Sequence, residues 1–74
     1  MTGVQWACLM AYARTLPAGQ TRRAVRSLAL RGQPERQGVA LVTAAGLGYL
    51  RHGRLTPQGE AVARAFLRRE GVSL

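Results

Sequence analysis

The 74-residue sequence contains no lysine, aspartate, asparagine or isoleucine, and it has few of the side chains that carry out catalysis or bind metals. Its one cysteine, Cys8, cannot form a disulfide within the chain, which excludes a disulfide-stabilised secreted scaffold. One histidine and three glutamates are too few for a four-ligand zinc site or for the paired groups of acid–base catalysis. We therefore expect neither an enzyme nor a bound metal or cofactor.

Long hydrophobic runs are also missing. The longest uncharged stretches cover residues 1–13 and 37–50, and both are shorter than the roughly 20 residues that a membrane-spanning helix needs. No arginine precedes Arg14, so the positively charged start of a signal peptide is lacking. The sequence predicts a cytoplasmic protein without a membrane partner.

Negative charge is scarce. Lys+Arg number 11 and Asp+Glu 3, which gives a formal net charge of +8, and every one of the cations is arginine. The excess is spread along the chain, since residues 1–37 hold six arginines and one glutamate while residues 38–74 hold five and two. Arginine binds phosphate through its planar, bidentate fork, and binding a polyanion is favoured by the release of counterions. The composition favours a nucleic-acid partner; the alternative is a solvated cationic surface that keeps the protein soluble.

Hydrophobic residues make up 47% of the chain, and its length allows one domain, residues 1–74. The first helix is predicted at Gly3–Thr15, where Thr2 and Gln5 have the spacing of a capping box. This helix is apolar over much of its circumference, so we expect it to be buried or to meet a partner. The larger side chains assigned to the core are Trp6, Cys8, Met10 and Tyr12.

A second helix is predicted at Gln20–Arg31 because the Pro-Gly-containing stretch before it breaks the pattern. Thr21 is expected to cap this helix, and Gly32 is expected to end it in a left-handed conformation. The apolar residues that recur at helical spacing predict an inner face made of Ala24, Val25, Leu28 and Ala29.

A third helix is predicted at Pro34–Ala45, with the proline in the first turn and Gly46 as the residue that ends it. Val39 and Val42 share one face with Gly46, and this face is predicted to point inward. The outward face is then predicted to carry Gln37, Ala40, Leu41 and Ala44, with Arg36 and Thr43 at its edges.

Residues 50–55 are predicted to form a short hairpin, because His52-Gly53 can make a tight turn between Leu50 and Leu55. Thr56 followed by Pro57 is a start signal for a fourth helix, with Thr56 as the N-cap. The inner stripe of this last helix is predicted to be Val62, Ala65 and Phe66.

The stretches Ala45-Gly46-Leu47 and Gly53-Arg54-Leu55-Thr56-Pro57-Gln58-Gly59 resemble the winged-helix family of bacterial and phage DNA-binding regulators. In that family the recognition helix ends in a Gly-Leu pair, a two-stranded wing follows, and a Leu-Thr-x-x-Gly stretch leads into the last helix. The resemblance covers about residues 20–70. It implies a winged helix-turn-helix fold, mainly α with a small β-hairpin, and it implies binding to double-stranded DNA as a transcriptional regulator.

The resemblance also implies where DNA would bind. The helix at Pro34–Ala45 would lie in the major groove, with Arg36 and Gln37 near its start able to pair with base edges. The arginines of the helix at Gln20–Arg31 would hold phosphates, and the wing would touch the backbone or the minor groove. Three later arginines, Arg64, Arg68 and Arg69, are expected to face away from DNA. The predicted DNA-binding residues are Arg22, Arg23, Arg26, Arg36, Gln37, Thr43, Arg51, His52 and Arg54.

A second hypothesis is a protein-interaction module that docks on the transcription or replication machinery without reading bases. It follows from the apolar character of the third helix, whose predicted outward residues Leu41 and Ala44 suit contact with a protein. A homodimer through the first helix is a further alternative, in which a second copy covers the apolar row that the rest of the chain leaves open. Salt dependence separates the first two hypotheses, since DNA binding weakens steeply with salt and apolar docking does not.

Overall fold

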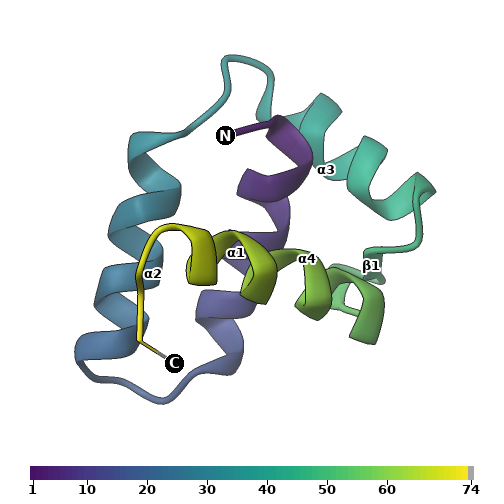
Figure 1. The fold of residues 1–74 in the computed structure, drawn as a ribbon. Coiled ribbons are helices and arrows are strands. Elements are labelled where there is room, and N and C mark those ends of the chain that lie inside the picture. The colour runs from purple at the N-terminus through teal and green to yellow at the C-terminus, as the bar shows by residue number, and fades with distance from the viewer. Residues whose placement is uncertain (74) are drawn as a thin grey trace.

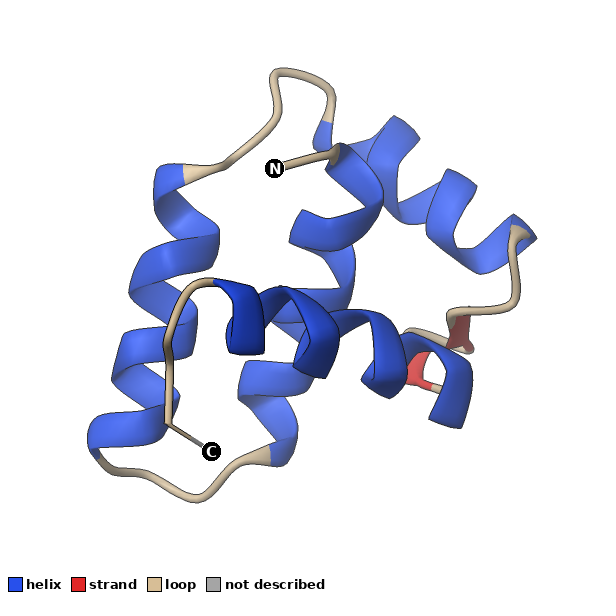
Figure 2. Cartoon of the chain, viewed as in Figure 1, coloured by secondary structure: helices blue, strands red, loops and turns tan. Residues whose placement is uncertain are grey.

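The computed structural model describes residues 1–73; Leu74, the last residue of the predicted domain, lies outside them. The chain is mainly helical, with four helices and one two-stranded antiparallel hairpin (Figures 1 and 2). The elements are α1 (Gly3–Thr15), α2 (Gln20–Arg31), α3 (Gln37–Gly46), β1 (Leu50–Arg51), β2 (Arg54–Leu55) and α4 (Pro57–Arg69).

Helix α1 lies at the centre of the molecule. It packs against α2, α3 and α4 and also contacts β2, and Figure 1 shows α2 and α3 on either side of it with α4 crossing it. The predicted capping box is present, because the Thr2 hydroxyl oxygen accepts from the Gln5 amide at 3.1 Å and the Thr2 amide donates to the Gln5 side chain at 2.9 Å. The buried residues of α1 are Trp6, Ala7, Cys8, Leu9, Ala11, Tyr12 and Ala13.

This central position explains why α1 is apolar on nearly every side. Both of its apolar rows are covered by other elements of the same chain, and Met10 is half-buried against the core. The apolar surface of α1 that a dimer would use is therefore buried by other parts of the same chain. The same side chains that prompted the homodimer hypothesis form the core of the folded domain.

Helix α2 has the predicted bounds, but the residues that cap its two ends do so differently from the prediction. Gly19 is its N-cap without a side-chain capping bond, so the prediction that Thr21 caps it is wrong. Gly32 has a φ of −99°, so it is not left-handed as predicted; it is small because a Cβ there would meet the side chain of Met1. Val25 and Ala29 are buried, whereas Ala24 of the predicted inner face is exposed.

Helix α3 begins three residues later than predicted, at Gln37, with Arg36 as its N-cap. The chain between α2 and α3 must cross the start of α1, because the two helices lie on either side of it (Figure 1). Extended residues cover about twice the distance per residue that helical ones do. Pro34 therefore lies in this connection and does not open the helix.

The face of α3 predicted to point inward is in fact exposed. Ala40 and Ala44 are buried, whereas Val39 and Val42 are 58% and 73% exposed. The reason is that α3 packs closely on α1. A Cβ placed on Gly3 of α1 would lie only 3.1 Å from the Cβ of Ala40 on α3. Only small side chains fit between the two helices, so the alanines face the core and the valines face outward.

The hairpin follows the prediction. Leu50 pairs with Leu55 and Arg51 with Arg54, which leaves His52 and Gly53 as the two-residue turn. Both have positive φ, 52° and 75°, as in a type I′ turn, whose twist matches that of the strands.

Helix α4 starts as predicted, with Pro57 in its first turn and the Thr56 hydroxyl oxygen accepting from the Gly59 amide at 3.1 Å. Its inner face differs in part from the prediction. Phe66 is buried as expected, but Val62 is only half-buried and Ala65 is exposed. The other buried residues of α4 are Gly59, Ala63 and Leu67.

Gly59 holds α4 against the hairpin. A Cβ at this position would collide with the carbonyl oxygen of Tyr49 and would lie 2.7 Å from the Leu55 side chain. Because a backbone atom cannot move aside cheaply, we expect Gly59→Ala to lower the free energy of unfolding by about 3 kcal/mol. Urea denaturation measures this change.

Gly38→Ala is the matched control, because Gly38 lies in a helix, has open space where a Cβ would stand and shows no positive φ. This variant should gain about 0.5–1 kcal/mol of stability from the better helix propensity of alanine. If both variants changed stability equally, the close approach at Gly59 would not matter.

Candidate nucleic-acid interface

Five arginines from three parts of the fold lie along connected pockets. One pocket of about 270 Å³ is lined by Arg14 of α1 and by Arg22 and Arg26 of α2. Arg14 also lines a neighbouring pocket together with Arg54 of β2, and Arg54 lines a third pocket with Arg51. Arg14 thus joins the arginines of α2 to those of the hairpin. We call this set the arginine track: Arg14, Arg22, Arg26, Arg51 and Arg54.

Among residues 1–73, no carboxylate is paired with the arginine track. Within residues 1–73, the one ion pair joins Arg64 to Glu60 on α4 at 3.7 Å, and no glutamate is among the described residues that line the three pockets. Arginines that lack an acidic partner keep their donors available for an external anion. The track is therefore a positively charged surface with the chemistry that phosphate groups require.

The geometry of the hairpin places two of these charges together. Arg51 and Arg54 are register partners, so their side chains leave the same face of the two-stranded sheet. Like charges directly opposite each other destabilise a sheet, and nothing in the hairpin fold requires two arginines here. His52 forms the exposed tip of the turn between them.

On α2 the predicted arginines separate into two groups. Arg22 and Arg26 are one helical turn apart and face Arg14 across their shared pocket. Arg23 is about 100° around the helix from Arg22, is exposed, and does not line that pocket.

Sequence reasoning missed Arg14. The signal that could have found it is that Arg14 is the one charged residue in an otherwise buried central helix. A charged side chain on such a helix must reach the surface. Arg14, in the last turn of α1, reaches it between α2 and the hairpin.

The residues predicted to read bases lie elsewhere. Arg36 and Thr43 line a pocket beside the start of α1, and Gln37 is exposed in the first turn of α3. None of the three lines the pockets of the arginine track. The Thr43 hydroxyl donates to the Val39 carbonyl oxygen at 2.8 Å, so its donor is already used within α3.

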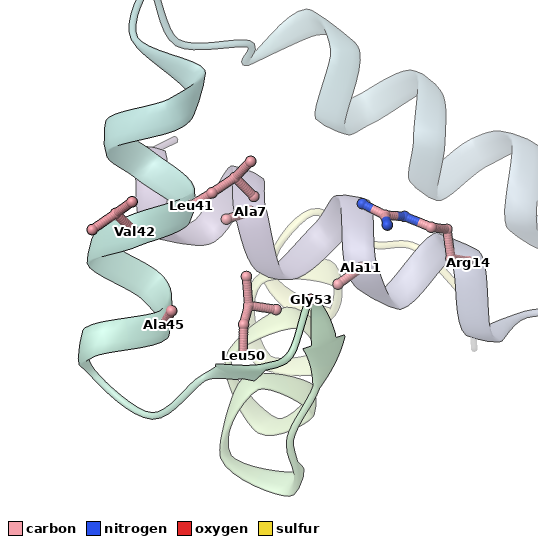
Figure 3. A pocket seen from close by; sticks show the side chains of 8 residues that line it. All are labelled: Ala7, Ala11, Arg14, Leu41, Val42, Ala45, Leu50 and Gly53. Atoms are coloured by element: carbon pink, nitrogen blue, oxygen red, sulfur yellow. The ribbon is translucent and has the colours of Figure 1, made fainter.

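The outward face of α3 has no charged residue. Val42 lies at its centre, and the residues around it are Gly38, Ala45 and Gly46. Ala44, which was predicted to face a protein partner, is fully buried, whereas Leu41 of the same prediction is partly exposed. An apolar pocket of about 310 Å³ lies between α3, α1 and the hairpin (Figure 3).

Two of the three arginines of α4 have partners within the chain. Arg64 forms the ion pair with Glu60, and the Arg69 guanidinium lies 5.8 Å from the centroid of the Phe66 ring. None of the arginines of α4 lines the three pockets of the arginine track.

Cys8 is not a nucleophile of this surface. It is fully buried on α1, and burial raises the pKa of its thiol because the thiolate is desolvated. We expect a thiol-specific reagent at pH 8 to react with the folded protein at least about 100-fold more slowly than with the urea-unfolded chain. Absorbance of the released chromophore follows both rates, and equal rates would show that Cys8 is accessible in the folded state.

Other classes of site are not formed by the described part of the chain. Among residues 1–73, no three His, Cys, Asp or Glu side chains come together in a group that could hold a metal ion. Within the same range, no helix combines the length and the apolar character needed to cross a membrane. Comparisons with protein families, curated proteins and solved structures found no match to this chain.

Proposed function

We propose that this chain is a small basic DNA-binding domain that acts by binding, without catalysis, as a bacterial or phage transcriptional regulator. The observation that carries the proposal is the arginine track, which has no carboxylate partner among residues 1–73 and in which Arg14 joins the arginines of α2 to those of the hairpin. In this proposal the track holds phosphates of one duplex, and binding is stabilised by counterion release.

The winged helix-turn-helix arrangement is part of the proposal. It is supported by the order of three helices, a tight hairpin and a last helix capped by Thr56. The packing departs from the expected pattern in one respect, because α2 and α3 each pack on α1 without a comparable interface between them. The hairpin takes the role of the wing, with Arg51 and Arg54 on the backbone of the duplex.

The proposal gives α3 a smaller part than a typical recognition helix has. Its outward face around Val42 can contact thymine methyl groups but offers no side-chain donor to other base edges. Base reading is left to Arg36 and Gln37 at the start of α3. Affinity in this account comes from the arginine track, and sequence preference comes from these two side chains.

The salt dependence of duplex binding tests the proposal. Fluorescence anisotropy with a labelled duplex of random sequence, measured between about 50 and 200 mM salt, gives the slope of log Kobs against log salt concentration. Five phosphate contacts predict a slope of about −4.5, and hence a loss of affinity of several hundred-fold over this range. A loss smaller than about tenfold would contradict the proposed role of the arginine track.

A further inference from the structure

The apolar pocket beside α3 forms a groove on the surface, which we call the α3 groove. Its floor is made of two small residues of α1, Ala7 and Ala11, and its walls are α3 and the hairpin. Figure 3 shows Leu50 of β1 pointing into the space between α3 and α1, with Arg14 at the opposite end. The residues lining the groove are Ala7, Ala11, Arg14, Leu41, Val42, Ala45, Leu50 and Gly53.

We propose that the α3 groove docks an acidic amphipathic helix of another protein. This interaction goes beyond the proposed DNA binding. The groove adjoins the arginine track at Ala11, Arg14 and Gly53, and it shares Val42 with the face of α3 that is proposed to contact thymine methyl groups.

The first argument is the amount of exposed apolar side chain on α3 and at its end; two of these residues, Leu41 and Val42, line the groove. Val42 is 73% exposed, Leu47 is 59% exposed and Val39 is 58% exposed. Leu41, on the groove side of α3, is also exposed. These four make up most of the large exposed hydrophobic residues among residues 1–73, and they gather on one helix and its end. Large apolar side chains that are exposed together on one element of a small domain mark a binding surface.

The shape of the surface selects a helix as the occupant. Strands β1 and β2 have two residues each, which is too short to template an added strand. The floor residues Ala7 and Ala11 are small, so apolar side chains of a partner can enter between α3 and the hairpin. A helix presents such side chains at positions i, i+3, i+4 and i+7 along one face, which matches a groove of this form.

The charge of the groove and of the whole chain indicates that the partner helix is acidic. Arg14 is the one charged residue that lines the groove, and none of the described lining residues is acidic. The whole chain carries a formal net charge of +8. An acidic partner complements this field, whereas a second copy of the chain would bring two strongly cationic surfaces together without a carboxylate in the groove to pair with them.

A display library of helical peptides with randomised surface positions tests the proposal. The library is selected on the wild-type protein after depletion on Val42→Gln, a variant that should remain folded because Val42 is largely exposed. We expect enrichment of peptides that combine aspartate or glutamate with large apolar residues spaced three and four apart. Thermal unfolding of Val42→Gln confirms that the variant is folded.

The best selected peptide is then synthesised with a fluorescent label and measured directly. Val42→Gln should weaken its binding about tenfold, and replacing its acidic residues by glutamine should weaken it comparably. Leu30→Gln is the matched control, because Leu30 is a similarly exposed apolar residue on α2, away from the groove, and should leave binding unchanged.

Three results would overturn the proposal. One is a selection that yields no enrichment, or enriches peptides without acidic residues. Another is a peptide that binds Val42→Gln as tightly as wild type. The third is sedimentation that shows a dimer at micromolar concentration that Val42→Gln dissociates, since the occupant would then be a second copy. Because Val42→Gln removes no charge and Val42 lies outside the arginine track, the salt dependence of binding to a random duplex, which tests the proposed function, is measured independently of these outcomes.

Discussion

Replacing Arg14, Arg22 and Arg54 together by alanine should reduce the affinity for duplex DNA about 100-fold at low salt. These three side chains connect α1, α2 and the hairpin in the arginine track. Each substitution removes one solvent-exposed ionic contact to phosphate, with a net value of about 1 kcal/mol, and about 1.4 kcal/mol corresponds to a tenfold change. The slope of log Kobs against log salt concentration should become shallower by about three units.

The matched control removes the same number of charges from another place. Arg64, Arg68 and Arg69 of α4 are replaced by alanine together, which lowers the net charge equally but leaves the arginine track intact. We expect this variant to keep most of its affinity and an almost unchanged slope. Equal losses in the two triple variants would mean that the protein responds to total charge and has no defined phosphate-binding surface.

Arg36→Ala and Gln37→Ala should each reduce the preference for a selected duplex over a random one by about 1–3 kcal/mol. These two side chains open α3 and are the ones near its exposed face that can pair with base edges. Binding to the random duplex should fall less, because it depends on the arginine track. Competition between the two duplexes, with the selected one taken from a random pool, measures the preference.

Thr43→Ala is the control for this experiment. Its hydroxyl donates to the Val39 carbonyl oxygen at 2.8 Å, so its donor does not project from α3 for use by a base. Removing it should leave the preference within about 0.5 kcal/mol of the wild type. If Thr43→Ala erased the preference while Arg36→Ala did not, the middle of α3 would read the bases and the account of this helix would be wrong.

Local signals in the sequence were sufficient to predict much of the fold. The capping box of Thr2 and Gln5 fixed the start of α1, and Thr56 with Pro57 fixed the start of α4. The His52-Gly53 turn was predictable because glycine readily adopts the positive φ that the turn requires. Each of these features depends on residues within a few positions of one another.

The face that α3 buries could not be predicted in this way. Residues 37–47 are apolar on almost every side, so a helical periodicity does not distinguish one face from another. The choice is made by size, because only alanines fit where Gly3 of α1 comes close to Ala40. That close approach belongs to the tertiary structure, and it reverses the predicted orientation of Val39 and Val42.

The candidate site was predictable in composition but not in layout. The count of arginines indicated a polyanion partner, and the prediction of Arg22, Arg26, Arg51 and Arg54 includes four members of the arginine track. Their connection depends on Arg14, whose position between α2 and the hairpin follows from the packing of α1 at the centre of the fold.

Chemical-shift mapping of the wild-type protein with a short random duplex tests the central claim most directly. The claim is that one continuous surface, from α2 through the end of α1 to the hairpin, holds the phosphates. We predict that the Nε–H resonances of Arg14, Arg22 and Arg54 shift together during the titration, while that of Arg68 on α4 does not. Shifts concentrated on the arginines of α4, or absent from Arg14, would contradict the account.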